Sequence, residues 1–194
     1  MTIVKYSLDQ FTADMESLIK GNPDQQKIFD SGSSLLERLV SDENVLPTEY
    51  RLPAANGSRP NHGTYLLYQG ESGLSVTAVV WGPGEHLAPP DHITWGMIGI
   101  LNNTLTETRY QRVDDRSKDG FATLELDREA NFKPGEITLL VPDTDEIHQM
   151  DNHTDHPTVE IHVYGNDLRG IDRHRYDLES GKVIGFRSGR YDNC

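Results

Sequence analysis

Glu160, His162 and Tyr164 stand two positions apart in the segment 158–164, and each of their side chains can exchange a proton. Valine or isoleucine fills the positions between them, so the segment alternates as a half-buried β-strand does. Because successive side chains point to opposite faces of a strand, the three polar groups share one face. The plainest interpretation is that this face meets water. If it lines a cavity instead, Glu160 can orient His162, and His162 can hydrogen-bond Tyr164, which positions the phenol for acid–base chemistry or for binding oxygen.

Two further histidines, His92 and His148, each stand at the start of a predicted strand that follows a turn. They belong to two similar segments, 81–101 and 134–149, which both carry a Pro-Gly turn near their beginning. A neutral imidazole is a common protein ligand for iron, nickel, copper and zinc. A single histidine is more often an ordinary surface or core residue, but two in this repeated arrangement predict a metal site.

Two amphipathic helices are predicted between residues 7 and 46. Ser7 can cap the first helix, and Gly21-Asn22-Pro23 ends it. The second runs from Gln26 to Val40, with its apolar residues on one side. Neither helix carries a cluster of functional groups, so we expect both to cover one face of a sheet.

From residue 64 onward the pattern becomes β, after a loop at 47–63 that is rich in proline, glycine and asparagine. Short strands broken by turn residues predict an all-β barrel or sandwich. The predicted strands are 65–68, 74–81, 92–101, 104–113, 122–126, 136–141, 147–150, 158–164 and, in a polar, arginine-rich tail, 182–186.

Length and composition limit the number of domains, the kind of partner and the expected location of the protein. A chain of 194 residues with a net charge of -13 fits one domain and argues against nucleic acid or an anionic membrane as the main partner. No apolar run is long enough for a membrane span, and the first residues do not form a secretion signal, so a cytoplasmic location is expected. The one cysteine, Cys194, cannot form an internal disulfide, which fits a reducing compartment. A monomer and a homodimer both remain open.

Several segments together resemble the thiol dioxygenases of the cysteine dioxygenase type, most closely the bacterial 3-mercaptopropionate dioxygenase branch. The resemblance runs from about residue 8 into the C-terminal tail. The matching segments are Tyr65-Leu66-Leu67-Tyr68, Val80-Trp81-Gly82-Pro83-Gly84, Asp91-His92 with Thr94-Trp95-Gly96, Pro134-Gly135-Glu136, Asp145-Glu146-Ile147-His148-Gln149 and Ile161-His162-Val163-Tyr164-Gly165.

This resemblance implies one cupin domain over residues 1–194. It would be an all-β jelly-roll barrel at 62–165, with N-terminal helices at 1–47 packed outside it and a C-terminal tail at 166–194. It also implies one Fe(II) on three histidines, a small-molecule thiol and dioxygen as substrates, and a sulfinate as product. By position, His92 and His148 match the second and third ligands, and His162 and Tyr164 match the family's histidine and tyrosine beside the metal.

The resemblance also implies a substrate site. Arg173 falls near the arginine that holds the substrate carboxylate in the bacterial branch, with Arg169 and Arg175 close enough to compete. Trp95 is assigned to the same site from the matching segment. Gly96 replaces the cysteine that crosslinks to tyrosine in animal enzymes, so no crosslink is expected.

Three departures from the family pattern matter. Pro90 stands where the family has its first histidine ligand, and proline has no side-chain donor. The predicted replacement ligand is His86 or Glu160. The Asp91 side chain should point away from the face that holds His92. Glu160 also replaces a serine, and its charge would repel an anionic substrate unless it is protonated or bound to the metal. Thr64 replaces the arginine that anchors cysteine in animal enzymes, which argues against L-cysteine as substrate.

The sequence therefore predicts an Fe(II)-dependent dioxygenase of this family, acting on a small thiol or on a carboxylated or chelating substrate. Two alternatives stay open. One is a metal-dependent cupin lyase, isomerase or hydrolase that does not use dioxygen. The other is a cupin whose site has decayed and which has no catalytic activity.

Overall fold

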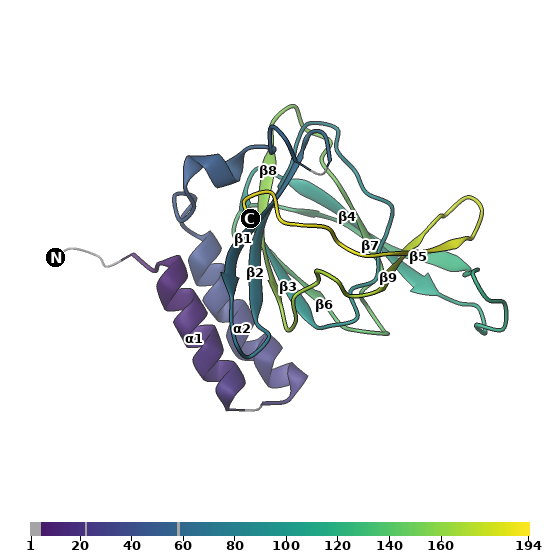
Figure 1. Ribbon diagram of the computed structural model, residues 1–194, viewed down its shortest axis with the longest axis horizontal. Coiled ribbons are helices and arrows are strands. Elements are labelled where there is room, and N and C mark those ends of the chain that lie inside the picture. The colour runs from purple at the N-terminus through teal and green to yellow at the C-terminus, as the bar shows by residue number, and fades with distance from the viewer. Residues whose placement is uncertain (1–4, 22, 58) are drawn as a thin grey trace.

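A computed structural model describes residues 5–21, 23–57 and 59–194 (Figure 1). Helix α1 spans Leu8–Lys20 and helix α2 spans Gln25–Val40. The predicted capping residue is confirmed, because the Ser7 side chain accepts a hydrogen bond from the Gln10 backbone and the Gln10 side chain accepts one from the Ser7 backbone. Asn22, part of the predicted helix break, lies outside the described residues.

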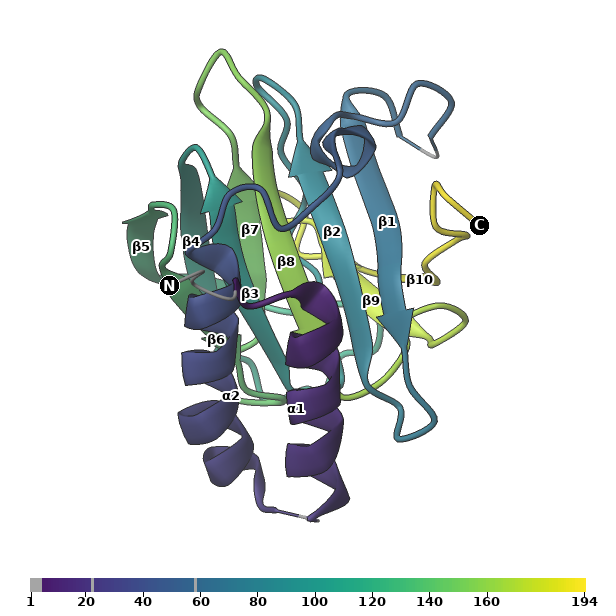
Figure 2. The ribbon, with the colours of Figure 1, turned by 90° about the vertical axis from the view of Figure 1, so that its left-hand side faces the viewer.

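Both helices lie side by side across one five-stranded sheet (Figure 2). Its order is β1-β2-β8-β3-β6, with all neighbours antiparallel. Apolar side chains of the helices and of the outer sheet face form the largest core cluster, which includes Phe11, Leu36, Val80 and Ile161. The strands are β1 His62–Gln69, β2 Ser75–Trp81, β3 Gly96–Asn102, β6 Ile137–Leu140 and β8 Thr158–Tyr164.

A second sheet, in the order β5-β4-β7, closes the other side of the barrel. Its strands are β4 Leu105–Arg112, β5 Leu124–Phe132 and β7 His148–Asp151. A second apolar cluster joins the two sheets across the interior, with Val79 and Ile100 from one sheet and Leu105 and Met150 from the other. The two antiparallel sheets face each other, their strand order is not sequential, and the helices lie outside. This arrangement confirms the predicted jelly-roll barrel with its N-terminal helical segment.

A short hairpin completes the fold, formed by β9 Arg173–Tyr176 and β10 Val183–Phe186. A 3-10 helix, Thr48–Arg51, interrupts the predicted loop before β1. Among the described residues, no helix has the length and apolarity that a membrane crossing requires.

Two sequence predictions of local structure were wrong. The segment 92–95 is a loop, and β3 begins only at Gly96. Strand β5 continues past the predicted end at residue 126 to Phe132. Of the two interpretations of residues 158–164, the structure excludes the solvent-facing one, because β8 is the central strand of its sheet, covered by the helices outside and by the barrel interior inside, and all its residues are buried.

Candidate functional site

The inner face of β8 carries the predicted row of polar groups, and the three side chains are in contact. Nδ1 of His162 lies 2.7 Å from the Tyr164 hydroxyl, and Nε2 lies 2.9 Å from a Glu160 carboxylate oxygen. The same oxygen accepts a 2.6 Å hydrogen bond from the indole N–H of Trp81 on β2. When Glu160 is ionised it can only accept, so Nε2 of His162 donates to it and Nδ1 accepts the Tyr164 proton.

The predicted pair His92 and His148 comes together from two distant parts of the chain. Their ring centroids are 5.0 Å apart, with the rings nearly perpendicular, and both residues are buried. The ring of Tyr164 stacks over His92 with the centroids 5.7 Å apart. The Glu146 side chain holds the His92 loop, since it accepts backbone hydrogen bonds from His92 at 2.7 Å and from Ile93 at 2.8 Å. Ile93 has a φ of 59°, a strained conformation that these contacts maintain.

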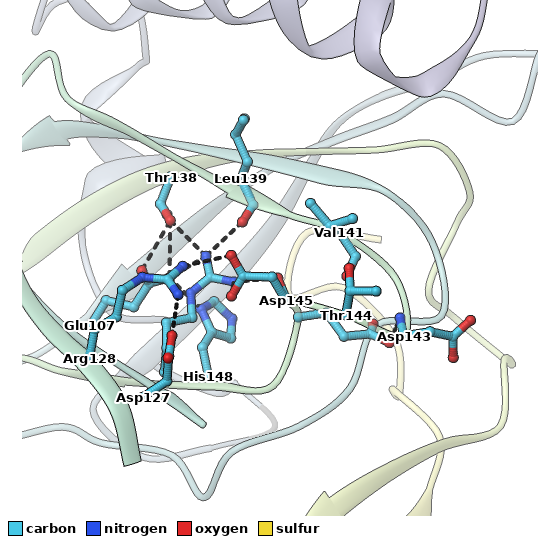
Figure 3. Close-up of polar contacts among 12 residues, drawn as sticks. Glu107, Asp127, Arg128, Thr138, Leu139, Val141, Asp143, Thr144, Asp145 and His148 are labelled. Carbon is cyan, nitrogen blue, oxygen red and sulfur yellow. Dashed lines mark hydrogen bonds and ion pairs between the residues drawn. The ribbon is translucent and has the colours of Figure 1, made fainter. Parts of the chain in front are cut away.

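His148 is oriented by a buried ionic network that sequence reasoning missed (Figure 3). Its Nδ1 lies 2.7 Å from Glu107, and Glu107 lies 2.9 Å from the guanidinium of Arg109. Arg109 is 1 % exposed and also donates to Thr138, to the Leu139 carbonyl and to the Asp145 carbonyl. With Nδ1 engaged, Nε2 of His148 is the nitrogen available to a ligand.

One cavity of about 370 Å³ collects most of these groups. His92, His148, His162 and Tyr164 all line it, and so does Arg173. Glu160 does not line it and lies behind His162 and Trp81, fully buried.

His62 also lines the cavity, and sequence reasoning did not single it out. It is the first residue of β1 and pairs with Trp81 of β2, with the two rings edge to face at 4.9 Å. Its Nε2 lies 3.2 Å from the Thr64 hydroxyl, and its Nδ1 is buried without a partner in the described chain.

Burial and charge set the protonation of these groups. Burial lowers the pKa of His92 well below its usual range, and the neighbouring His148 and Arg173 lower it further. Burial also lowers the pKa of His148, although the Glu107 contact opposes this change. The pKa of His62 falls to about 3, from burial and from the charges of Arg59 and His162. Burial raises the pKa of Tyr164 above its ordinary value, so the phenol keeps its proton at neutral pH.

His92 and His148 fit a metal ion as a pair of neutral nitrogen ligands in one cavity, but the structure does not bring the predicted third ligand to them. His86 is exposed and lies outside the cavity, in a bridge with Asp151. Pro90 does line the cavity. Within residues 5–21, 23–57 and 59–194, no three histidine, cysteine, aspartate or glutamate side chains form a group that could hold a metal.

Of the other predicted site residues, some line the cavity and some lie outside it. Arg173 is buried in the cavity wall, whereas Trp95 lies outside the cavity and packs on the outer core cluster. Asp91 points away from the cavity as expected, since its carboxylate accepts from the backbone and ring of His174. Gly96 leaves room for the Tyr164 ring, because a Cβ there would lie 2.8 Å from a ring carbon.

Solved structures with a similar arrangement include a complex of oxalate oxidase with the substrate analogue glycolate. It is 18% identical with a TM-score of 0.44, over 58% of this chain and 55% of that chain, so the match spans little more than half of the oxidase. A sugar phosphate isomerase of the cupin superfamily from Silicibacter pomeroyi is 18% identical, with a TM-score of 0.45, over 74% of this chain and 83% of that one.

A cupin 2 conserved barrel domain protein from Salinispora arenicola is 16% identical, with a TM-score of 0.42, over 63% of this chain and 86% of that one. No protein-family model matches the chain. Likenesses this distant carry no argument about activity, which must come from the site itself.

Proposed function

We propose that this protein is an Fe(II)-dependent cupin oxygenase related to the thiol dioxygenases. Its substrates would be dioxygen and a small thiol or a carboxylated, chelating compound. The observation that carries the proposal is the meeting of His92 and His148 in the same cavity as the His162–Tyr164 pair and Arg173.

His92 and His148 would hold the metal. A bound Fe(II) would supply open positions where substrate and dioxygen meet, together with the redox chemistry that joins them. Two protein ligands leave more of these positions open than three do, which suits a substrate that binds through two atoms.

Tyr164 and His162 would hold or transfer a proton beside the reacting groups. Tyr164 is protonated at neutral pH and is hydrogen-bonded to His162, so the pair can hold a proton at the phenol oxygen or take it at Nδ1. Glu160 is a positioning residue in this proposal, because it contacts His162 and Trp81 and does not reach the cavity.

Arg173 would bind an acidic group of the substrate. Its guanidinium lines the cavity and donates to the Asp91 carbonyl, next to His92 in the chain. Arginine stays charged even in a buried site, so an anion there gains a charge-assisted hydrogen bond.

Metal content and oxygen uptake test the proposal together. Protein purified without added metal is assayed for metal, and then for oxygen consumption with ferrous iron and a panel of thiols, thioacids and β-dicarbonyls. We expect about one iron per chain and uptake with one substrate class. Protein that neither carries metal nor takes it up on reconstitution would overturn the proposal and favour a decayed site.

Two alanine variants sharpen this test. His148→Ala should lose both metal and oxygen uptake while remaining folded. His86→Ala is the matched control and should keep its iron, since His86 is exposed outside the cavity. Loss of iron in His86→Ala and not in His148→Ala would reverse the assignment.

A metal-dependent lyase, isomerase or hydrolase is the second candidate. The incomplete ligand set and the His162–Tyr164 pair favour it, because proton transfer needs no bound dioxygen. Metal binding with turnover of substrate but without oxygen uptake would identify it.

A further inference from the structure

The charged side chains that line the cavity are all cationic. No aspartate or glutamate of the described residues lines it, although the whole chain has a net charge of -13. A cationic cavity in an acidic protein concentrates anions. The six arginines are Arg59, Arg169, Arg173, Arg175, Arg187 and Arg190.

Most of these arginines do not need a ligand. Arg190 is exposed to solvent. Three others already contact carboxylates that stand outside the cavity lining: Arg59 contacts Glu85, Arg169 contacts Asp167 and Arg187 contacts Asp172.

Arg173 is buried and Arg175 is half-buried, unlike Arg190, and neither contacts a carboxylate in the described chain, unlike the other three. They stand two positions apart on β9, so their side chains leave the same face of the strand. Their guanidinium carbons lie 4.6 Å and 4.2 Å from the ring centroid of Phe186 on β10. The Nε atom of each is buried without a partner in the described chain.

An unpaired buried cation is costly, and Arg173 is only 6 % exposed. Arg173 donates hydrogen bonds to two neutral groups, the Asp91 carbonyl and the Ser188 hydroxyl. These neutral acceptors do not balance the positive charge of the Arg173 guanidinium, and an anionic ligand would.

Arg173 and Arg175 line the same cavity as the candidate metal pair. Strand β9 is hydrogen-bonded to the segment that leads into His92, since the Asp91 N–H donates to the His174 carbonyl at 3.0 Å and the Tyr176 N–H donates to the Pro89 carbonyl at 3.0 Å. Pro90 forms a backbone bridge with Arg175. An anion held by these arginines would therefore lie in the cavity that His92 and His148 also line.

We infer that the cavity binds a small organic acid with two carboxylate groups, one for Arg173 and one for Arg175. Two positions along a strand separate the bases of these side chains by about 7 Å, which a short carbon chain with a carboxylate at each end can span. The inference rests on the proposed function in one respect, because it takes this cavity as the substrate site.

Isothermal titration calorimetry of the full chain tests the inference without turnover. The probes are malonate, succinate, propionate and inorganic phosphate. The better of the two dicarboxylates should bind roughly 10–100-fold tighter than propionate, since it gains a second charged hydrogen-bonding group. Equal affinity for dicarboxylates and propionate, or tighter binding of phosphate than of both dicarboxylates, would overturn the inference.

Arg175→Met should reduce dicarboxylate affinity to about that of propionate, a loss of roughly 10–100-fold, and should leave propionate binding nearly unchanged. Arg175→Gln repeats the test if the methionine variant does not fold. Arg187→Met is the matched control, and a change below about threefold is expected because Asp172 already neutralises that arginine. An equal loss in Arg187→Met would show a general charge effect and reject the two-arginine site.

The same titrations distinguish this inference from the proposed function. If the protein binds a dicarboxylate but neither holds metal nor consumes oxygen, the proposed function is refuted and this inference stands.

Discussion

Nδ1 of His148 lies 2.7 Å from a carboxylate oxygen of Glu107, so a buried acid sets the orientation of a candidate metal ligand. Burial raises the pKa of Glu107, but the His148 contact and the charge of Arg109 outweigh burial and lower it to about 2. Glu107 is therefore ionised at neutral pH. It fixes the ring of His148 and increases the basicity of the nitrogen that is left for a ligand.

Replacing this acid should weaken metal binding without removing a ligand. Glu107→Gln is expected to lower metal affinity by about 10–100-fold, because partners of metal-bound histidines have effects of this size. The measurement is competition with a chelator, after circular dichroism has shown that the variant is folded. Glu125→Gln on the exposed strand β5 is the control. Unchanged affinity in folded Glu107→Gln would remove Glu107 from the site.

Arg109 should matter mainly for stability. Arg109→Met leaves the buried Glu107 carboxylate without its arginine partner, and breaking such a buried pair costs about 3–5 kcal/mol in the free energy of unfolding. Urea unfolding measures this loss. The double variant Glu107→Gln/Arg109→Met should lose less than the sum of the single variants, because it leaves no unpaired charge. Strict additivity would contradict the network.

Acid should destabilise the fold through His62. The pKa of this histidine is about 3 in the folded protein, against an ordinary 6.5, from burial and the charges of Arg59 and His162. A depressed folded pKa contributes stability that is present above pH 6.5 and is lost as the pH falls toward 3, at up to about 1.4 kcal/mol per pH unit.

Unfolding in urea at several pH values between 7 and 4 tests this expectation. His62→Gln should flatten the dependence of stability on pH, whereas His153→Gln, at an exposed position, should not. Parallel curves for the wild type and His62→Gln would show that His62 is not the group that titrates.

Glu160 can be tested as a positioning residue against its predicted role as a ligand. Its carboxylate is engaged by Trp81 at 2.6 Å and His162 at 2.9 Å. Glu160→Gln should therefore keep its metal and lose about 10–100-fold in kcat, because His162 is no longer held by a charge. Metal analysis and steady-state kinetics on the same preparation distinguish the roles. Loss of metal from a folded variant would make Glu160 a ligand.

Most of the barrel could be predicted because its strands alternate. Strand β8 shows this most clearly, since its apolar residues lie under the helices and its polar residues lie inside. Strand β9 was missed because Arg173-His174-Arg175-Tyr176 has no apolar alternation, and only its pairing with β10 makes it a strand. The loop at 92–95 was predicted as β, since no local pattern reveals the positive φ of Ile93 or its contact with Glu146.

Site residues that share one strand could be predicted from their spacing in the sequence. Those that reach the site through the pairing register of neighbouring strands could not. The row Glu160, His162 and Tyr164 needed only the period of a strand. Glu107 and Arg109 carry charges, which normally face water, and their link to the site follows from the register that places Arg109 opposite His148. The place of His62 likewise follows from its pairing with Trp81.

Tyr164 provides the most direct test of proton handling in the cavity. Its hydroxyl is 2.7 Å from Nδ1 of His162, and burial raises its pKa so that it stays protonated. Tyr164→Phe keeps the ring that stacks on His92 and removes only the hydroxyl, so metal content should not change while kcat falls by about 10²–10⁴-fold. Tyr65→Phe is the matched control, because that hydroxyl bonds the Leu52 carbonyl outside the cavity. A Tyr164→Phe enzyme with wild-type kcat would leave the hydroxyl no role in the chemistry and would assign Tyr164 to packing against His92 alone.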